Sequence, residues 1–119
     1  MFLEVISVPV SDQDRAIEFY RDKLGFKVIR DNPFDEDRRW VEVSPSPDAQ
    51  TTISLVTWFE QMPPGSAQGL VLKVEDIEKI RAELIKRDVR VEPIFDTPWG
   101  RFANFTDLDG NGWSLRQEN

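Results

Sequence analysis

The sequence of 119 residues contains no cysteine and no histidine. Without cysteine the chain cannot form disulfides, present a thiolate nucleophile or bind zinc through sulfur. Without histidine it has no imidazole general base, no Ser-His-Asp triad and no two-histidine iron site. Any metal would therefore be held by oxygen ligands, which favour hard ions such as magnesium, calcium or manganese.

Long apolar runs and an excess of positive charge are also missing. No stretch approaches the roughly 18 apolar residues that span a bilayer, and the N-terminal residues do not resemble a signal peptide, so we expect a cytoplasmic protein. The net charge of −7 argues against nucleic acid as a partner, because phosphates require basic patches. The length fits a single domain over residues 1–119.

The sequence does contain the same order of predicted elements twice. The first copy predicts a strand, a helix and three strands, over residues 3–10, 11–25, 26–30, 38–44 and 51–58. The second copy predicts the same order over residues 69–74, 75–88, 89–95, 100–107 and 112–117. Between them, FEQMPPGSAQ reads as a linker. We therefore predict module one over about residues 1–58, a linker over about 59–68 and module two over about 69–119.

A calcium-loop pattern occurs near the C-terminal end. The stretch DLDGNGWSLRQE fits D-x-[DN]-x-[DN]-G-x₅-E at every defined position, namely Asp107, Asp109, Asn111, Gly112 and Glu118. A calcium loop of this type lies between two helices, whereas the residues before Asp107 read as a strand. We therefore predict that DLDGNG is a hairpin turn, in which Asp and Asn side chains bond to local backbone groups.

Two motifs carry a family resemblance. They are V-S-D-x-x-R-A-x-x-F-Y-x-x-x-L-G-F from Val10 to Phe26 and D-x-D-G-N from Asp107 to Asn111. With the paired units they resemble the vicinal oxygen chelate superfamily, which includes glyoxalase I, extradiol dioxygenases, fosfomycin-resistance proteins and bleomycin-binding proteins. The resemblance implies an α+β fold of two paired β-α-β-β-β modules, with helices outside and a ligand cup inside, often near a homodimer interface.

The resemblance also implies where the enzymes of this superfamily carry metal ligands. Counted from the motifs, these positions are occupied here by Val5, Ser54, Gly69 and Ser114. Aliphatic side chains and serine hydroxyls do not make a tight divalent site. We therefore expect no metal or other cofactor, and no residues of the sequence support a divalent ion in their place.

Alternation along the predicted strands indicates which side chains line the cup. One face is apolar and should pack beneath the helices, with Trp113 in the core. The other face is polar and aromatic, which suits a small-molecule site. We predict that the ligand-binding residues are Trp40, Glu42, Thr52, Ser54, Lys73, Trp99, Phe102, Asn104, Ser114 and Arg116.

Several of these side chains have a predicted role and an alternative one. Trp40 and Phe102 can stack on a flat ligand, and Glu42 can pair with a cation or accept a hydrogen bond. Lys73 and Arg116 can clamp a carboxylate. Alternatively, the charged residues are salt-bridge partners across adjacent strands, and Trp40 belongs to the core or to a dimer interface.

Three functions follow from these residues, and a small-molecule-binding homodimer comes first. It would hold a flat or cationic ligand against Trp40 and Trp99, since Trp99 at a turn tip should cover either the pocket mouth or a partner subunit. The second is a glyoxalase-like lyase or dioxygenase-type enzyme with an oxygen-only metal site, in which Glu42 is ligand or base. The third is a metal-free isomerase that uses Glu42 and Lys73.

Overall fold

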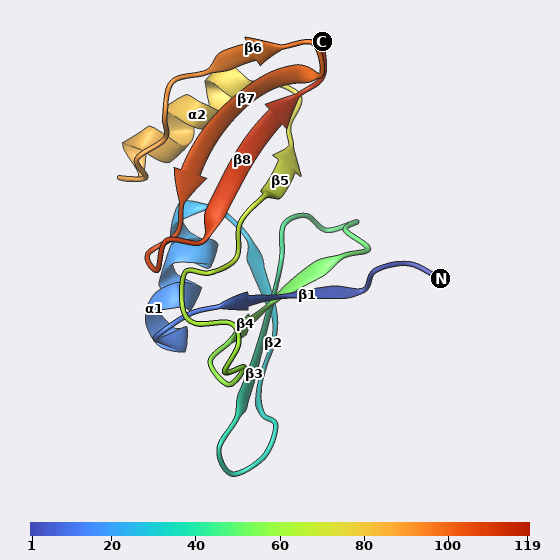
Figure 1. Ribbon diagram of the computed structural model, residues 1–119, viewed down its shortest axis with the longest axis vertical. Coiled ribbons are helices and arrows are strands. Elements are labelled where there is room, and N and C mark those ends of the chain that lie inside the picture. Colours follow the sequence, from blue (N-terminus) through green and yellow to red (C-terminus); the bar gives the residue numbers. More distant parts are fainter.

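The computed structural model describes residues 1–119 and contains two four-stranded mixed sheets (Figure 1). The first sheet has the order β1-β4-β3-β2, with β1 Val5–Pro9, β2 Lys27–Pro33, β3 Arg39–Ser44 and β4 Thr52–Val56. The second has the order β5-β8-β7-β6, with β5 Leu70–Lys73, β6 Phe95–Thr97, β7 Gly100–Thr106 and β8 Gly112–Gln117. Each sheet combines one parallel pair with antiparallel pairs. The predicted α+β fold of two paired modules is confirmed.

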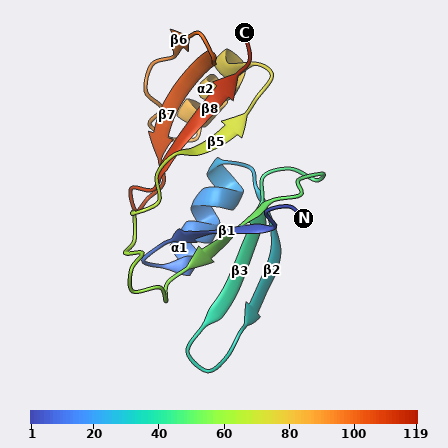
Figure 2. The same ribbon diagram turned by 45° about the vertical axis from the view of Figure 1, so that its right-hand side comes forward.

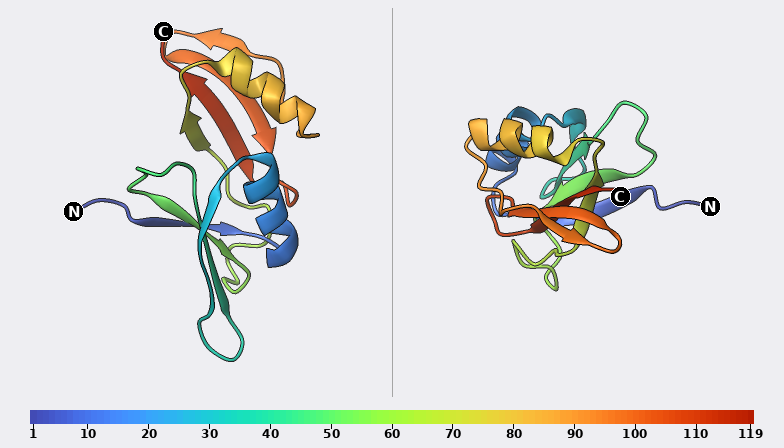
Figure 3. Two further views of the ribbon diagram at one scale, coloured as in Figure 1. Left: turned by 180° about the vertical axis from the view of Figure 1, so that it is seen from behind. Right: turned by 90° about the horizontal axis from the view of Figure 1, so that it is seen from above.

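Each module has one helical segment, and an aspartate caps each of them. The first begins as α1 (Gln13–Ile17) behind Asp12 and continues as a π-helix, η1 (Glu18–Lys23). The second, α2 (Ile77–Lys86), begins behind Asp76. The cap carboxylates accept a hydrogen bond from a backbone N–H of the first turn, which would otherwise have no partner. Seen from behind, both helices lie in front of their sheets (Figure 3).

The predicted strand over residues 89–95 is wrong for most of its length. Val91 forms only an isolated bridge with Phe105, and the strand β6 does not begin until Phe95. Pro93 explains the interruption, because proline has no backbone N–H to donate to the ladder. The helix over 11–25 and the other strands were predicted within a few residues of their ends.

One core joins the two modules. Nineteen buried side chains form a single cluster that includes residues of both sheets and both helices. At its centre, the rings of Tyr20 and Phe26 lie 5.8 and 6.0 Å from the ring of Trp113 in β8. Trp113 is only 4% exposed, so its predicted place in the core is confirmed. The first helix therefore packs against both sheets.

The molecule is elongated, with extents of 46 × 34 × 26 Å. The two sheets lie one above the other along the long axis, in both side views (Figures 1 and 2). In this arrangement β1 and β5 are end strands of their sheets. No helix is long and apolar enough to cross a membrane.

The stretch DLDGNG is the turn between β7 and β8, as predicted. Oδ1 of Asp107 accepts hydrogen bonds from the backbone N–H groups of Asp109 and Asn111, both at 2.9 Å. Oδ2 accepts from the Tyr20 hydroxyl at 2.6 Å and from Nδ2 of Asn111 at 2.8 Å. Both carboxylate oxygens of Asp107 are thus engaged by donors of the chain, which is the local bonding expected of a turn.

The same turn ties the modules together. Nδ2 of Asn111 also donates to the Pro9 carbonyl at 2.8 Å, and its Oδ1 accepts from the Ala67 N–H at 3.0 Å. Trp113 Nε1 donates to the Tyr20 hydroxyl at 3.0 Å. We call Pro9, Tyr20, Asp107, Asn111 and Trp113 the junction cluster. It fixes the position of the second sheet relative to the first helix and β1.

Candidate functional site

Four aromatic rings form a continuous row on the N-terminal module. The ring of Trp40 lies 6.1 Å from that of Phe34 and 6.2 Å from that of Trp58, which lies 6.0 Å from Phe59. We call these four residues the aromatic row. Phe34 is 60% exposed and Phe59 is 46% exposed, so the row presents ring surface to solvent at both ends.

Three members of this row were missed by the sequence reasoning. Phe34 and Phe59 lie in loops, where alternation does not assign a face. Trp58 follows β4 by two residues, and continued alternation from Ser54 and Val56 places it on the cup face. That signal was present in the sequence.

Glu42 holds Trp40 in position. One carboxylate oxygen of Glu42 accepts from Trp40 Nε1 at 2.9 Å, and the other accepts from the Thr52 hydroxyl at 2.7 Å. Arg30 lies 3.6 Å from the oxygen that receives the indole. Glu42 is only 6% exposed, and these three groups compensate its burial. Both of its oxygens are therefore already engaged within the chain.

Strand register aligns four polar residues across the first sheet. Ser7 pairs with Ser54, Ser54 with Glu42, and Glu42 with Arg30. The Ser54 side chain is fully buried and its hydroxyl oxygen has no hydrogen-bond partner. In the second sheet Val71 pairs with Ser114. The predicted ligand-binding residue Ser54 is therefore closed to solvent within one chain.

These pairs show whether the residues suit the metal that the superfamily resemblance implies. The register places Ser7, rather than Val5, beside Ser54, and Val71, rather than Gly69, beside Ser114. The positions counted from the motifs and the positions paired by register both offer serine hydroxyls and groups without a donor atom, which do not suit a divalent ion. Nowhere in the chain do three acidic side chains come together in a group that could hold one. We derive no chemistry through a metal.

The C-terminal module carries an open cavity of about 600 Å³ on its second sheet. Its lining consists of Gln68, Gly69, Arg90, Glu92, Asn104, Phe105, Thr106, Gly112, Trp113 and Ser114. We call it the polar cavity, because most of these side chains are polar. It brings together the predicted residues Asn104 and Ser114. Arg90 and Glu92 were missed, although alternation around the buried Val91 places both of them on this face.

Lys73 and Arg116 form ion pairs rather than a free anion clamp. Nζ of Lys73 lies 3.0 Å from Glu118, and Arg116 lies 3.9 Å from the same carboxylate. The hydrogen bond from Lys73 lowers the pKa of Glu118 below its ordinary value. This is the salt-bridge arrangement given above as the alternative, and both cations are partly neutralised by it.

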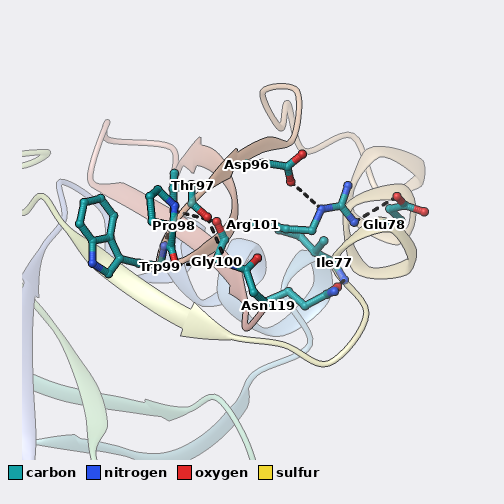
Figure 4. Close-up of polar contacts among 10 residues, drawn as sticks. Ile77, Glu78, Asp96, Thr97, Pro98, Trp99, Gly100, Arg101 and Asn119 are labelled. Atoms are coloured by element: carbon teal, nitrogen blue, oxygen red, sulfur yellow. Dashed lines mark hydrogen bonds and ion pairs between the residues drawn. The ribbon is translucent and has the colours of Figure 1, made fainter.

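Trp99 stands at the tip of the hairpin between β6 and β7 and is 73% exposed (Figure 4). Its backbone is firmly held: Thr97 Oγ1 accepts from the Trp99 N–H at 3.1 Å, and Arg116 donates to the Trp99 carbonyl at 2.6 and 3.0 Å. Asn119 Nδ2 donates to two carbonyls of the same turn. Trp99 does not line the polar cavity. Within one chain it therefore does not cover the mouth of the polar cavity.

The hairpin is also anchored to α2, and Phe102 lies on the other face of β7. Arg101 lies 2.9 Å from Asp96 and 3.2 Å from Glu78 of α2 (Figure 4). On the opposite face of β7, the Phe102 ring stacks on Phe95, with centroids 5.8 Å apart and planes 20° apart. The predicted site residues thus fall into two groups, one on each module.

Comparison with known proteins places these features in a family. The Glyoxalase/Bleomycin resistance protein/Dioxygenase superfamily matches residues 3–115. TnmS3, an antibiotic binding protein from Streptomyces sp. CB03234, has 43% identity and a TM-score of 0.95 over 100% of this chain and 97% of its own. A superfamily member from Sphaerobacter thermophilus has 34% identity and a TM-score of 0.90, over 99% of this chain and 98% of its own. The uncharacterized protein YetH of Bacillus subtilis is 33% identical over 94% of each chain.

Proposed function

Because the chain belongs to the Glyoxalase/Bleomycin resistance protein/Dioxygenase superfamily, we propose that it binds a flat aromatic small molecule of the antibiotic class. The aromatic row carries this proposal. Its neighbouring rings offer apolar area and a preferred orientation to a flat ligand. TnmS3 supports the choice of ligand class, since it is an antibiotic binding protein with 43% identity.

Glu42 acts in this proposal as a positioning residue. Its hydrogen bond to Trp40 Nε1 fixes the plane of the indole, so little side-chain freedom is lost when a ligand stacks on it. Both carboxylate oxygens of Glu42 already have donors. We therefore propose that the ligand stacks on Trp40 as an uncharged ring and does not pair with Glu42 as a cation.

We further propose that the binding unit is a homodimer. β1 and β5 are end strands, and such edges present unpaired backbone groups that another chain can cover. Trp99 is a large exposed side chain on a firmly held turn, a common feature of interface anchors. In this dimer the N-terminal module of one copy faces the C-terminal module of the other. The partner subunit's Trp99 would then cover a ligand that lies on the aromatic row.

A tryptophan fluorescence titration with a panel of flat aromatic antibiotics tests the proposal. We expect saturable quenching by at least one compound. Trp40→Ala should weaken its binding about tenfold, equivalent to about 1.4 kcal/mol of lost stacking. Phe2→Ala, which removes a 62% exposed ring outside the site, is the matched control and should bind normally. A chain that responds to no compound would contradict the proposal.

The enzymatic alternatives rest on a different observation, the buried carboxylate of Glu42. A glyoxalase-like lyase, a dioxygenase-type enzyme or a metal-free isomerase would use it as ligand or base. Glu42→Gln keeps its size and removes its charge. If the unmodified chain turns over a substrate of these classes and the variant does not, an enzymatic function is supported. Equal activity of the two proteins would exclude Glu42 as the base.

A further inference from the structure

Three polar side chains of the polar cavity have no hydrogen-bond or ion-pair partner in the chain. The guanidinium of Arg90 and the carboxylate of Glu92 take part in none of the ion pairs or side-chain hydrogen bonds of the chain. The hydroxyl of Thr106 likewise has no partner. The aromatic row differs in this respect, because the polar atoms beside it are engaged. Polar groups that converge on a cavity without partners are available to a ligand.

The wall that carries Arg90 and Glu92 is fixed in place. The bridge between Val91 and Phe105 directs both charged side chains to the face opposite the core. The Glu92 N–H donates to the Asn104 carbonyl at 2.8 Å. From α2, Arg81 donates to the carbonyls of Val91 and Glu92 at 3.1 and 2.9 Å. The cavity is therefore preorganised, and little ordering is needed when a ligand binds.

The two amide side chains of the cavity are oriented by their own contacts. The Ser114 hydroxyl donates to Oδ1 of Asn104, which leaves the amide nitrogen of Asn104 free to donate. Nε2 of Gln68 donates to the carbonyls of Gly65 and Gly110, both at 3.2 Å. Its Oε1 lies over Gly112, where an added Cβ would come within 2.1 Å of it. The cavity thus offers one fixed amide donor and one fixed amide acceptor.

The charges of the cavity select against a charged ligand. Arg90 and Glu92 contribute one charge of each sign, so an anion or a cation attracted by one is repelled by the other. A hydroxyl group both donates and accepts. It can donate to Glu92 or Gln68 and accept from Arg90 or Asn104. Several hydroxyls on one ring would satisfy several of these groups together.

We infer that the polar cavity binds a hydroxyl-rich, uncharged group such as a sugar. The inference extends the proposed function and rests on it in one respect, since the hydroxyl-rich group would belong to the ligand whose flat part stacks on the aromatic row. The cavity volume of about 600 Å³ lies within the range of about 300–1,000 Å³ for small-molecule sites.

An NMR titration of the full-length chain tests this inference with three separate probes: methyl α-D-glucopyranoside, glycine and inorganic phosphate. We expect the neutral sugar to shift the side-chain amide signal of Asn104 and the backbone signals of Arg90 and Glu92, with millimolar affinity. Shifts caused by glycine or phosphate but not by the sugar would overturn it in favour of a zwitterion or anion site. A cavity that responds to no probe would also overturn it.

Two variants and a control separate a binding site from a general effect. Glu92→Ala and Asn104→Ala each remove one of the groups assigned to the hydroxyls, and each should weaken the sugar-induced shifts at least tenfold. Glu60→Ala, a change of the same kind in the exposed linker, should leave them unchanged. The indole N–H signal of Trp40 reports on the aromatic antibiotics in the same samples. If no antibiotic shifts the Trp40 signal while the sugar still shifts the signals of the polar cavity, the proposed function alone would be contradicted.

Discussion

At the scale of single residues, Tyr20 is a polar side chain held from two sides within the core. It is fully buried, donates to Asp107 and accepts from Trp113. Burial, followed by the nearby negative charge of Asp107, raises the pKa of Tyr20 far above its ordinary value. Tyr20 is also the only tyrosine of the chain. Its ionisation can therefore be followed by absorbance without interference from another phenol.

A raised pKa in the folded state predicts a loss of stability at high pH. The neutral phenol contributes its full stabilisation below the unfolded-state pKa of about 10. Above that pH the unfolded chain releases a proton that the folded chain retains, so stability falls as the pH rises. We expect no tyrosinate absorbance while the chain is folded, and its appearance together with loss of the circular dichroism signal. Titration of the folded protein near pH 10 would contradict this.

The variant Tyr20→Phe separates this effect from other alkaline transitions. It removes the hydroxyl and leaves Trp113 Nε1 and one Asp107 oxygen without that partner. We expect it to lower the free energy of unfolding at neutral pH by about 1–3 kcal/mol, measured by urea denaturation. Above pH 10 the difference from the unmodified chain should shrink, because only the unmodified chain has a tyrosine to ionise.

At the scale of elements, the linker between the modules is bound at several points. The Gly65 N–H donates to the Pro9 carbonyl at 3.3 Å, and the Ala67 N–H donates to Asn111. Gly65 has a φ of +84° and lies so close to the β7–β8 turn that an added Cβ would be 2.0 Å from the Asp109 carbonyl oxygen. The sequence FEQMPPGSAQ therefore predicts a connection correctly, but its composition does not reveal that it is packed.

A pair of glycine substitutions measures this packing. Gly65→Ala places a side chain in a left-handed conformation, which costs about 1–2 kcal/mol, and adds a clash with the Asp109 backbone. Gly69→Ala is the matched control, because φ is +80° and nothing lies within 4 Å of the added Cβ. We expect Gly65→Ala to lower the urea midpoint clearly more than Gly69→Ala does. Equal midpoints would mean that the β7–β8 turn moves away from the added Cβ without loss of stability.

Local patterns in the sequence predicted the elements better than the site. Asp12 and Asp76 signal their helices, and alternation places Trp113 in the core, because both depend on neighbours in the chain. The polar line from Ser7 to Arg30 depends on how four strands pair, and no local pattern fixes that register. The bond between Trp40 and Glu42 joins two residues on one strand face and could have been predicted.

At the scale of the whole molecule, the two groups of candidate site residues lie on different modules, which follow one another along the long axis (Figure 1). The aromatic row belongs to the N-terminal module and the polar cavity to the C-terminal module. In the proposed dimer, the aromatic row of one copy and the polar cavity of the other would face one ligand. The proposed ligand, with a flat part on the aromatic row and a hydroxyl-rich part in the polar cavity, therefore depends on association.

The exposed indole of Trp99 gives a direct test of association. If it anchors a dimer, Trp99→Ala should weaken dimerisation at least thirtyfold, the effect of losing about 2 kcal/mol at an interface hot spot. Leu108→Ala, which shortens a 58% exposed side chain at the β7–β8 turn, serves as the control. Analytical ultracentrifugation over a range of concentrations measures both. Dimers of unchanged strength in the Trp99 variant would remove this residue from the interface.

The contact between Pro9 and Asn111 also orders the events of folding. It spans 102 positions of sequence. During synthesis, the Pro9 carbonyl therefore has no Asn111 to bind, and the Tyr20 hydroxyl no Trp113, until the end of the chain has been made. Contacts closed over such long loops form slowly, after local helices and hairpins. We expect substitutions in the junction cluster to accelerate unfolding while leaving the folding rate almost unchanged. The chain would then open first between its modules, each still retaining its own sheet.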